Sequence, residues 1–284
     1  MRPPMRLSSD FVHMAAPLGV RRAGPCVFIA LLLIAVFSTV APARTLIIEG
    51  LSEAPLKWMV DSDPRGIDID IMTEVLRDMG ITDYRFQLVD NGRRLLHNAQ
   101  VGASDIVLTL SQNDERSQYL DYPQEAHLLL DWRFAVRAED RDRITFNDFS
   151  DLARHRVGAA AEYSYTDTFW QSGLDIEVVA KNDLLIPMLL ENRFDVVPVN
   201  YLSTLYETLR NGQREKIAFI YPPLRRAPYY NVFTKASDYP DKDTFLARYD
   251  QIIREMRNDG RLATIFQDYL GPDGLDWWQS QYQN

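Results

Sequence analysis

Short apolar segments alternate with segments of helical periodicity through most of the chain after residue 43, and this alternation constrains the fold more than any other feature. It is typical of an α/β layer with a largely parallel sheet, because helices connect successive parallel strands. The first series predicts strands at 45–50, 84–89 and 105–110, and helices at 71–80 and 92–102.

A second series of the same kind begins near Arg156. It predicts strands at 156–161, 176–180 and 195–199 and helices at 165–173, 183–193 and 201–212. Two consecutive series in one chain predict two lobes. The stretch 128–143 lies between them and changes from an apolar strand to a charged segment, and 227–235 is a further extended apolar run.

The end of the chain predicts two helices, each with one apolar face. The first is interrupted at Asp259-Gly260, and the second is closed by Gly271-Pro272. The two apolar faces consist of Phe245, Tyr249, Ile252, Ile253 and Met256, and of Leu262, Ile265, Phe266 and Tyr269. We interpret both faces as parts of the hydrophobic core.

The stretch Arg65 to Gly80, "RGIDIDIMTEVLRDMG", carries two periodicities. Its isoleucines alternate with two aspartates as in a half-buried strand, and the following apolar residues recur at helical spacing. We therefore expect a short extended piece at 66–69, followed by a helix from Ile71 with Asp70 as its N-cap. No third ligand or histidine accompanies Asp68 and Asp70, so a catalytic or metal-binding pair is the less favoured interpretation.

The first 43 residues have the features of a secretory signal peptide. Arg21 and Arg22 precede an apolar run at 27–40, and Ala41-Pro42-Ala43 matches an A-x-A cleavage pattern. The run is short against the roughly 20 apolar residues of a membrane helix. An uncleaved membrane anchor is the alternative. The segment also contains Cys26, the one cysteine of the chain.

The remaining chain is acidic and free of cysteine. Without four arginines and one aspartate of the first segment, the 31 basic and 40 acidic residues become 27 and 39, a net charge of −12. Such a surface disfavours nucleic acid as a partner. His97, His127 and His155 stand apart from one another, and no catalytic, zinc-binding or phosphate-binding motif occurs. We expect no enzyme activity, no cofactor and no metal site.

Several segments, in order, resemble the type 2 periplasmic solute-binding proteins, in particular the family 3 group that delivers amino acids to ABC importers. They are "GIDIDIMTEVLRDMG", "DERSQYLDYP", "LARHRVGAAAEYSYTDTF", "LLENRFDVVPVN", "YYNVFTKASD" and "MRNDGRLATIFQDYLG". The resemblance spans Leu46 to Gly271. It implies a two-lobed fold with two hinge strands, 131–139 and 228–236, and a ligand cleft between the lobes.

The resemblance also implies a division of the chain. Residues 1–43 would be the signal peptide, 44–134 the first part of lobe 1, 135–230 lobe 2, and 231–284 the return to lobe 1 with the C-terminal helices.

By the same resemblance, Arg116 binds the carboxylate of the ligand. A guanidinium offers two parallel donors to a carboxylate, which makes this role chemically sound. A solvated loop charge is the alternative for Arg116. Thr109 and Ser111 are candidate supporting donors, although the segment between them and Arg116 is about two residues longer than is usual in the family.

In the second lobe, Tyr163, Ser164 and Tyr165 fall where the family grips the same carboxylate at a helix N-terminus. Ser164 could equally be a simple N-cap. Asn200 matches a position where amino-acid binders place an aspartate against the ligand's ammonium. An asparagine accepts a hydrogen bond but does not neutralise a cation.

Trp58 follows the first strand, where the family has an aromatic wall for the ligand; it is either that wall or part of the core. Four further residues near the return hinge either line the cleft or pack the crossing: Arg225, Arg226, Tyr229 and Tyr230.

The expected signal peptide and the resemblance together imply an exported, periplasmic protein, and we expect a monomer. Its small, carboxylate-bearing ligand, an amino acid or related organic acid, would be captured by hinge closure and passed to an ABC permease. An orphan or sensory binding protein that reports to a membrane receptor is one alternative. A dehydratase-like enzyme on the same fold is the other.

Overall fold

The computed structural model describes residues 44–161, 165–240 and 242–281. The expected signal peptide at 1–43 and the candidate residues Tyr163 and Ser164 lie outside these ranges. Within them, no helix is both long and apolar enough to cross a membrane.

The main sheet has seven strands in the order β10-β7-β11-β5-β1-β4, and β6 pairs with β11. The pairs β1–β4 and β1–β5 are parallel, whereas β11 runs antiparallel to β5, β6 and β7. The strands are β1 (Leu46–Leu51), β4 (Tyr84–Val89), β5 (Ile106–Ser111), β6 (Leu120–Asp121), β7 (Leu128–Arg137), β10 (Val197–Asn200) and β11 (Ile217–Thr234).

Lobe 1 contains β1, β4, β5 and β6 with four long helices and a small hairpin. The hairpin is β2 (Trp58–Val60) with β3 (Asp63–Arg65), and a 3-10 turn, η2, spans Arg116–Gln118. The helices are α2 (Ile67–Met79), α3 (Gly92–Gln100), α7 (Lys242–Asn258) and α8 (Arg261–Ser280).

Lobe 2 contains β10 and the parallel pair of β8 (Val157–Ala160) with β9 (Ile176–Val179). Its helices are α4 (Asp167–Trp170), α5 (Leu185–Leu190) and α6 (Tyr201–Arg210). Short 3-10 turns connect these elements: η3 (Ala138–Asp140), η4 (Phe149–Leu152), η5 (Asn182–Leu184) and η6 (Arg214–Lys216). All the segments of the second predicted series have their predicted type and are shorter than predicted, and β10 ends one residue later, at Asn200.

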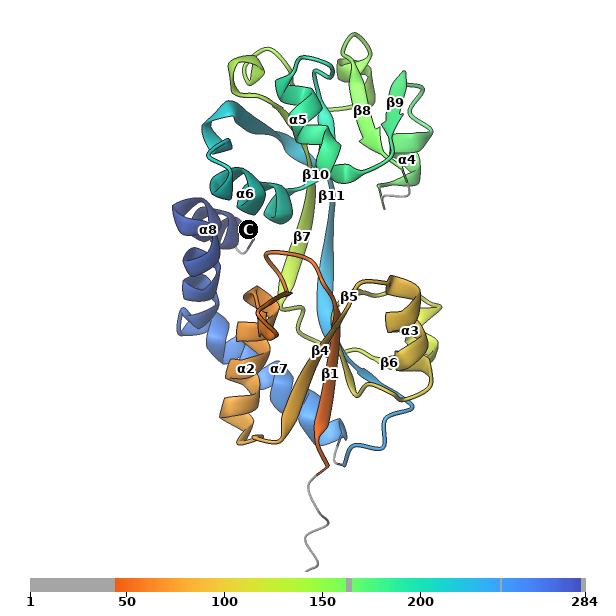
Figure 1. Ribbon diagram of the computed structural model, residues 1–284, viewed down its shortest axis with the longest axis vertical. Helices are drawn as coiled ribbons and strands as arrows, with labels where there is room; N and C mark the ends of the chain where they lie inside the picture. The colour runs from red at the N-terminus through yellow and green to blue at the C-terminus, as the bar shows by residue number, and fades with distance from the viewer. Residues whose placement is uncertain (1–43, 162–164, 241, 282–284) are drawn as a thin grey trace, which may run out of the picture. The chain divides into compact units, whose positions relative to one another are not determined.

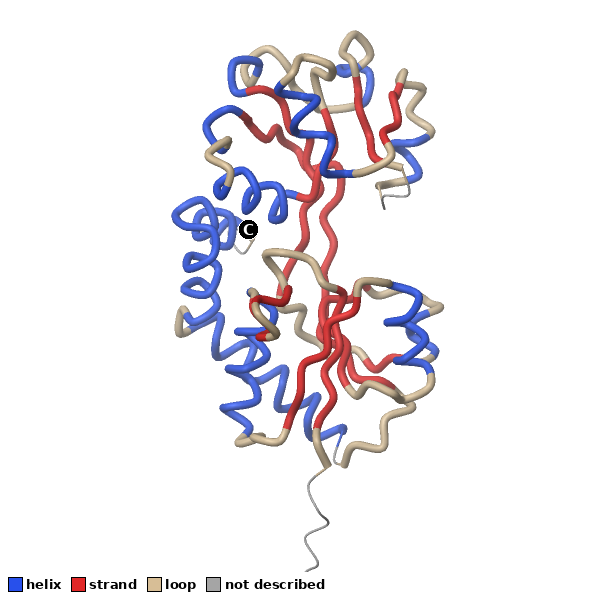
Figure 2. Tube along the Cα trace, in the orientation of Figure 1, coloured by secondary structure: helices blue, strands red, loops and turns tan. Residues whose placement is uncertain are grey.

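The strands β7 and β11 pass from one lobe to the other and pair along both (Figures 1 and 2). Their ladder is interrupted between Ile220 and Arg225, where the register shifts. Leu128 and Leu130 of β7 belong to the core of lobe 1, whereas Phe134 belongs to the core of lobe 2. One strand therefore carries residues of two separate cores.

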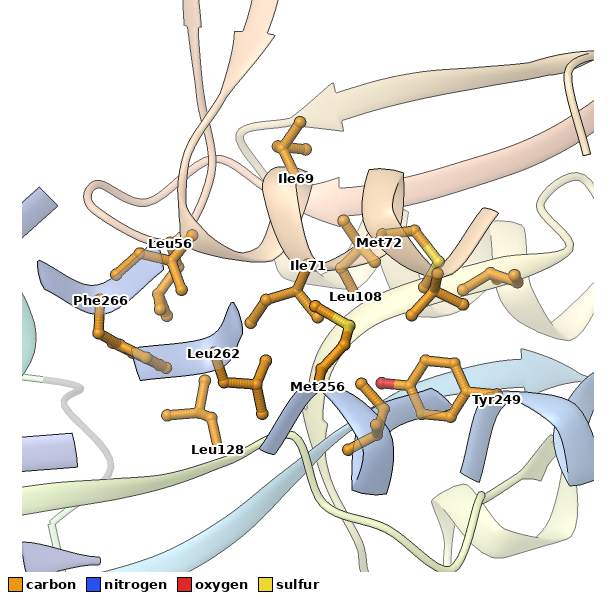
Figure 3. Close-up of a cluster of buried hydrophobic side chains, with 14 of the residues drawn as sticks. Leu56, Ile69, Ile71, Met72, Leu108, Leu128, Tyr249, Met256, Leu262 and Phe266 are labelled. Carbon is orange, nitrogen blue, oxygen red and sulfur yellow. The ribbon is translucent and has the colours of Figure 1, made fainter. Parts of the chain in front are cut away.

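The larger apolar cluster of lobe 1 is built by α2, α7 and α8 against the sheet, and a smaller one lies between the sheet and α3. Figure 3 shows side chains from α2, β5, α7 and α8 gathered around one centre. They include Ile71, Met72, Leu108, Met256, Leu262 and Phe266, each at most 1% exposed. The predicted apolar faces of both C-terminal helices lie here, apart from Ile265 and Tyr269, which pack at its edge. Burial of each such side chain stabilises the fold by about 1.5–3 kcal/mol.

The predicted extended piece at 66–69 is wrong, because α2 already begins at Ile67 with Gly66 as its N-cap. Gly66 has φ 130°, and a Cβ there would lie 2.3 Å from the Leu56 carbonyl oxygen, so only glycine fits this turn. The helix shows two periodicities because it is buried on most sides: Ile67, Ile69 and Ile71 are all buried. Asp70 is therefore not the N-cap, and its Oδ2 accepts from the Tyr269 hydroxyl at 2.7 Å.

The last helix continues beyond its predicted end. Gly271 has φ 62° and ψ −153°, which breaks the helical geometry as Gly271-Pro272 predicted, but helical residues resume on the far side. This added segment carries Trp277, which packs against Phe266 of α8 and Tyr201 of α6. It ties α8 to a helix of lobe 2.

Candidate ligand-binding cleft

A cavity of about 380 Å³ opens beside the hinge strands. Its walls come from the end of β1 and the loop after it, from α3, β5 and η2, and from both hinge strands. Asn200, at the end of β10, also lines it, and Trp132 of β7 belongs to the core of lobe 2. The lining consists of Leu51, Glu53, Lys57, Gly92, Leu95, Leu96, Leu108, Thr109, Leu110, Ser111, Arg116, Leu130, Trp132, Asn200, Arg225 and Tyr229.

Arg116 and Ser111, two of the predicted site residues, meet at this cavity. Arg116 opens η2, and its Nη1 donates to the Ser111 hydroxyl at 2.8 Å and to the Ser111 carbonyl at 3.0 Å. The Asn113 side chain accepts from the Arg116 backbone N–H at 2.8 Å and fixes the turn. The Nε and Nη2 edge of the guanidinium has no partner among the described residues, so it can receive a carboxylate.

Tyr122, the aromatic residue six positions after Arg116, supports the same corner. Its hydroxyl donates to the Ser111 carbonyl at 3.0 Å. Burial raises the pKa of Tyr122 to about 12, against the opposing effect of the Arg116 charge. The tyrosine is therefore neutral at physiological pH and acts as a hydrogen-bond donor.

Thr109 lines the cavity in an unusual backbone conformation. Its φ is +59°, in the left-handed region that β-branched residues rarely occupy. Its N–H donates to the Asn231 side chain at 3.0 Å, and its hydroxyl contacts the Asp68 carboxylate. Because an ionised carboxylate only accepts, the hydroxyl proton of Thr109 is committed to Asp68.

Asp68 forms the centre of a buried polar cluster beneath the cavity. The Lys57 ammonium lies 3.0 Å from Oδ2, and the His127 Nε2 lies 3.0 Å from Oδ1. Burial alone would raise the pKa of Asp68, but the charge of Lys57 and the hydrogen bonds from His127 and Thr109 hold it well below its ordinary value. Asp68 is therefore an ionised structural anchor.

Lys57 and Glu53 also line the cavity and were not predicted as site residues from the sequence. Both follow β1, at the carboxyl end of a strand, where ligands of α/β sheets commonly bind. Their backbones pair across a two-residue bridge, with N–O distances of 2.6 and 2.8 Å. A lysine in a loop is ordinarily exposed to solvent, but Lys57 is only 2% exposed.

Asn200 lies where the end of β10 meets α6. It is the N-cap of α6, with its Oδ1 accepting from the Ser203 N–H at 3.3 Å. It is buried and reaches the cavity, but its side-chain oxygen already has a local partner.

Two other predicted residues are not among those lining the cavity. Trp58 packs against the rings of Tyr206 and Tyr269, with centroids 5.6 and 5.9 Å apart. Tyr165 is buried in lobe 2, where its hydroxyl donates to the Pro198 carbonyl at 3.2 Å. In this structure the side chains of Trp58 and Tyr165 therefore contribute to packing.

The four residues near the return hinge divide between two roles. Arg225 and Tyr229 line the cavity. Arg226 instead pairs with Asp131 of β7, with Nε 2.6 Å from Oδ1, and Tyr230 packs edge-on against Tyr122.

Comparison with known proteins identifies the family. Residues 47–272 match the bacterial extracellular solute-binding proteins, family 3, and the chain belongs to this family. Its proteins are exported, non-enzymatic binding proteins in general. No curated protein matches the sequence.

Solved structures with the same fold come from transporters and from a sensor. An ancestral cationic amino acid solute-binding protein has 15% identity and a TM-score of 0.67, with 80% of this chain and 95% of that chain covered. Substrate-binding domain 2 of Lactococcus lactis GlnP, in an open conformation, has 17% identity and a TM-score of 0.65, with 81% and 97% covered. A histidine kinase sensor domain has 17% identity and a TM-score of 0.59, with 80% and 96% covered.

Proposed function

We propose that this protein is an exported, periplasmic binding protein that captures a small carboxylate-bearing ligand between its lobes and delivers it to an ABC importer. The observation that carries the proposal is the Arg116 guanidinium at the cavity, held by Ser111 on one nitrogen and open on its other edge. Family membership supports the binding role.

Closure of the lobes would complete the site. In this structure lobe 1 and the hinge supply nearly all of the described lining. A ligand held by Arg116 would gain contacts with lobe 2 when β7 and β11 bend, as hinge-closing proteins do. The predicted contribution of Tyr163 and Ser164 to that closed site stays a prediction.

Binding without turnover is the proposed outcome. None of the described residues that line the cavity is a histidine or cysteine, the residue types best suited to proton transfer or nucleophilic attack near neutral pH. A dehydratase-like activity would need such a group from elsewhere.

A thermal-shift screen over amino acids, organic acids and opines tests the proposal. A ligand that binds only the folded state stabilises it by about 2.7 kcal/mol at one hundred times its Kd. We expect a rise in melting temperature with at least one carboxylate and no consumption of that compound. If no carboxylate raised the melting temperature, or the compound were converted, the proposal would be wrong.

A sensory role is the second candidate, favoured by the similarity to a histidine kinase sensor domain. In that case the protein would bind its ligand in the same cleft, and the ligand-bound form would signal to a membrane receptor. Co-purification of the ligand-bound protein with an ABC permease would favour transport, and co-purification with a receptor would favour sensing.

A further inference from the structure

The charges around the cavity are unequal. Three cationic side chains line it, Lys57, Arg116 and Arg225, against the single carboxylate of Glu53. Of the Glu53 oxygens, Oε1 already accepts from the Ser203 hydroxyl at 3.3 Å. Asp68 beneath the cavity compensates the charge of Lys57, which leaves the two arginines against Glu53. The described lining therefore offers more to anionic groups of a ligand than to an ammonium group.

Lys57 is held in place by its surroundings. A Cβ at Gly50 would lie 2.7 Å from Lys57 Cδ, so glycine leaves the space through which the lysine stem passes. The side chain is 3% exposed and ends 3.0 Å from Asp68 Oδ2. A fixed ammonium loses little conformational entropy when it binds a ligand.

Asp68 does not use up the donors of Lys57. The carboxylate is shared among Lys57, Thr109 and His127, so it takes one hydrogen bond from the ammonium. An ammonium has three N–H donors. Thr109 has committed its own proton to Asp68, so Lys57 is the residue of this cluster that lines the cavity and keeps donors for a ligand.

The walls between the charged groups are apolar. Leu96, Leu108 and Leu130 line the cavity together with the cationic residues. These side chains can pack against a short carbon skeleton of the ligand. They offer no hydrogen bond to a polar group of the ligand that is buried against them. Acidic groups of the ligand would therefore have to lie at the cationic residues.

We propose that the ligand carries two acidic groups, one bound by Arg116 and the other by Lys57, and that Lys57 is the specificity-determining residue for the second. This inference rests on the proposed function, because it assigns the ligand class of the same cleft. Asp68 is then a positioning residue that holds Lys57 without contacting the ligand.

Isothermal titration calorimetry with isosteric pairs tests the ligand class. The probes are L-glutamate with L-glutamine, and glutarate with its monoamide, which differ by one charged group at nearly constant shape. We expect each diacid to bind at least tenfold more tightly than its amide, or ~1.4 kcal/mol. An amide that binds as tightly as its acid would overturn the inference, as would a monocarboxylate that binds more tightly than every dicarboxylate, and both would leave the proposed function intact. Absence of binding by any carboxylate would instead overturn the proposed function.

Variants of Lys57 test the assignment of the residue. Lys57→Met keeps the stem and removes the charge, and should abolish the preference for diacids while the affinity for the amides stays within about twofold. Because the single variant leaves Asp68 without its cation, the double variant Lys57→Met/Asp68→Asn restores neutrality and should give the same loss. The exposed Lys181→Met is the matched control and should keep the preference. A full diacid preference in the folded double variant would contradict the role of Lys57.

Discussion

Two parts of the molecule each contain a fully buried aspartate: the floor, which is the polar cluster around Asp68 beneath the cavity, and the hinge, which contains Asp131. The two aspartates differ in where their hydrogen-bond partners come from. Asp68 in the floor has Lys57, His127 and Thr109 as partners, all from lobe 1 or the residue just before β7. Asp131 in the hinge has partners from three separate elements.

The partners of Asp131 are Arg133 on β7, Arg226 on β11 and Trp277 on α8. Arg133 also lies between two rings, 3.8 Å from the Tyr201 centroid and 4.3 Å from that of Tyr221. The Arg226 side chain is 30% exposed, so water can replace part of this pairing. The floor is thus a fully buried cluster that fixes the Lys57 ammonium beside the cavity. The hinge cluster instead connects β7, β11 and α8, and one of its arginines is partly exposed to solvent.

The largest expected effect is that of Asp68→Ala. The change leaves the ammonium of Lys57 buried without its counter-charge, and removal of one partner from a buried ion pair costs about 3–5 kcal/mol. Urea unfolding measures the free energy of unfolding. Asp70→Ala in the same first turn of α2, which loses the bond from Tyr269, is the control and should cost about 1 kcal/mol. Equal losses for the two variants would refute the special status of Asp68.

Asp131→Ala should cost less, about 1.5–3 kcal/mol, the range for hydrogen bonds to charged groups. Arg226 can turn to water, and Arg133 keeps its two aromatic neighbours. The same urea titration gives the value. A loss larger than that of Asp68→Ala would reverse the comparison between floor and hinge.

Acid should lower the free energy of unfolding through both aspartates, Asp68 in the floor and Asp131 in the hinge. For Asp131, burial raises the pKa, but the hydrogen bonds from Arg226 and Arg133 outweigh it and lower the pKa below its usual 3.8. The pKa of Asp68 is likewise lowered. A carboxyl with a lowered folded-state pKa stabilises the protein above its unfolded-state value, and this contribution is lost as pH falls through the folded value.

The free energy of unfolding should therefore decrease from about pH 5 downwards, with part of the slope removed in Asp68→Asn and in Asp131→Asn. Urea titrations at pH 7, 5, 4 and 3 measure these slopes. Identical slopes for the wild type and both variants would show that neither carboxyl contributes.

The smallest expected effect is that of Trp277→Phe. Phenylalanine keeps the packing on Phe266 and Tyr201 and removes the N–H that reaches Asp131 at 3.4 Å. We expect a loss of about 1 kcal/mol in unfolding free energy. A loss above that of Asp131→Ala would mean that α8, and not the arginines, dominates the hinge cluster.

The sequence predicted the fold well because most elements have clear periodicities and end signals. It failed at the start of α2, since Ile67, Ile69 and Ile71 are all buried and apolar residues at every second position imitate a strand. It also missed the helical segment after Gly271, where Pro272 appeared to end the chain's last helix.

The candidate site was predictable only in part. Family resemblance led to Arg116, Ser111, Thr109 and Asn200, which all line one cavity. The cluster around Asp68 was not predictable, because Lys57 and His127 are 11 and 59 residues away and no local pattern links them. Lone lysines and histidines acquire meaning only when the fold brings their partners together.

Calorimetry on Arg116→Ala tests the central claim most directly. With the tightest carboxylate from the thermal-shift screen, we predict at least a tenfold rise in Kd, ~1.4 kcal/mol, while the neighbouring control Ser117→Ala binds like the wild type. An unchanged Kd in a folded Arg116→Ala protein would show that the ligand's carboxylate is bound elsewhere and would contradict the account.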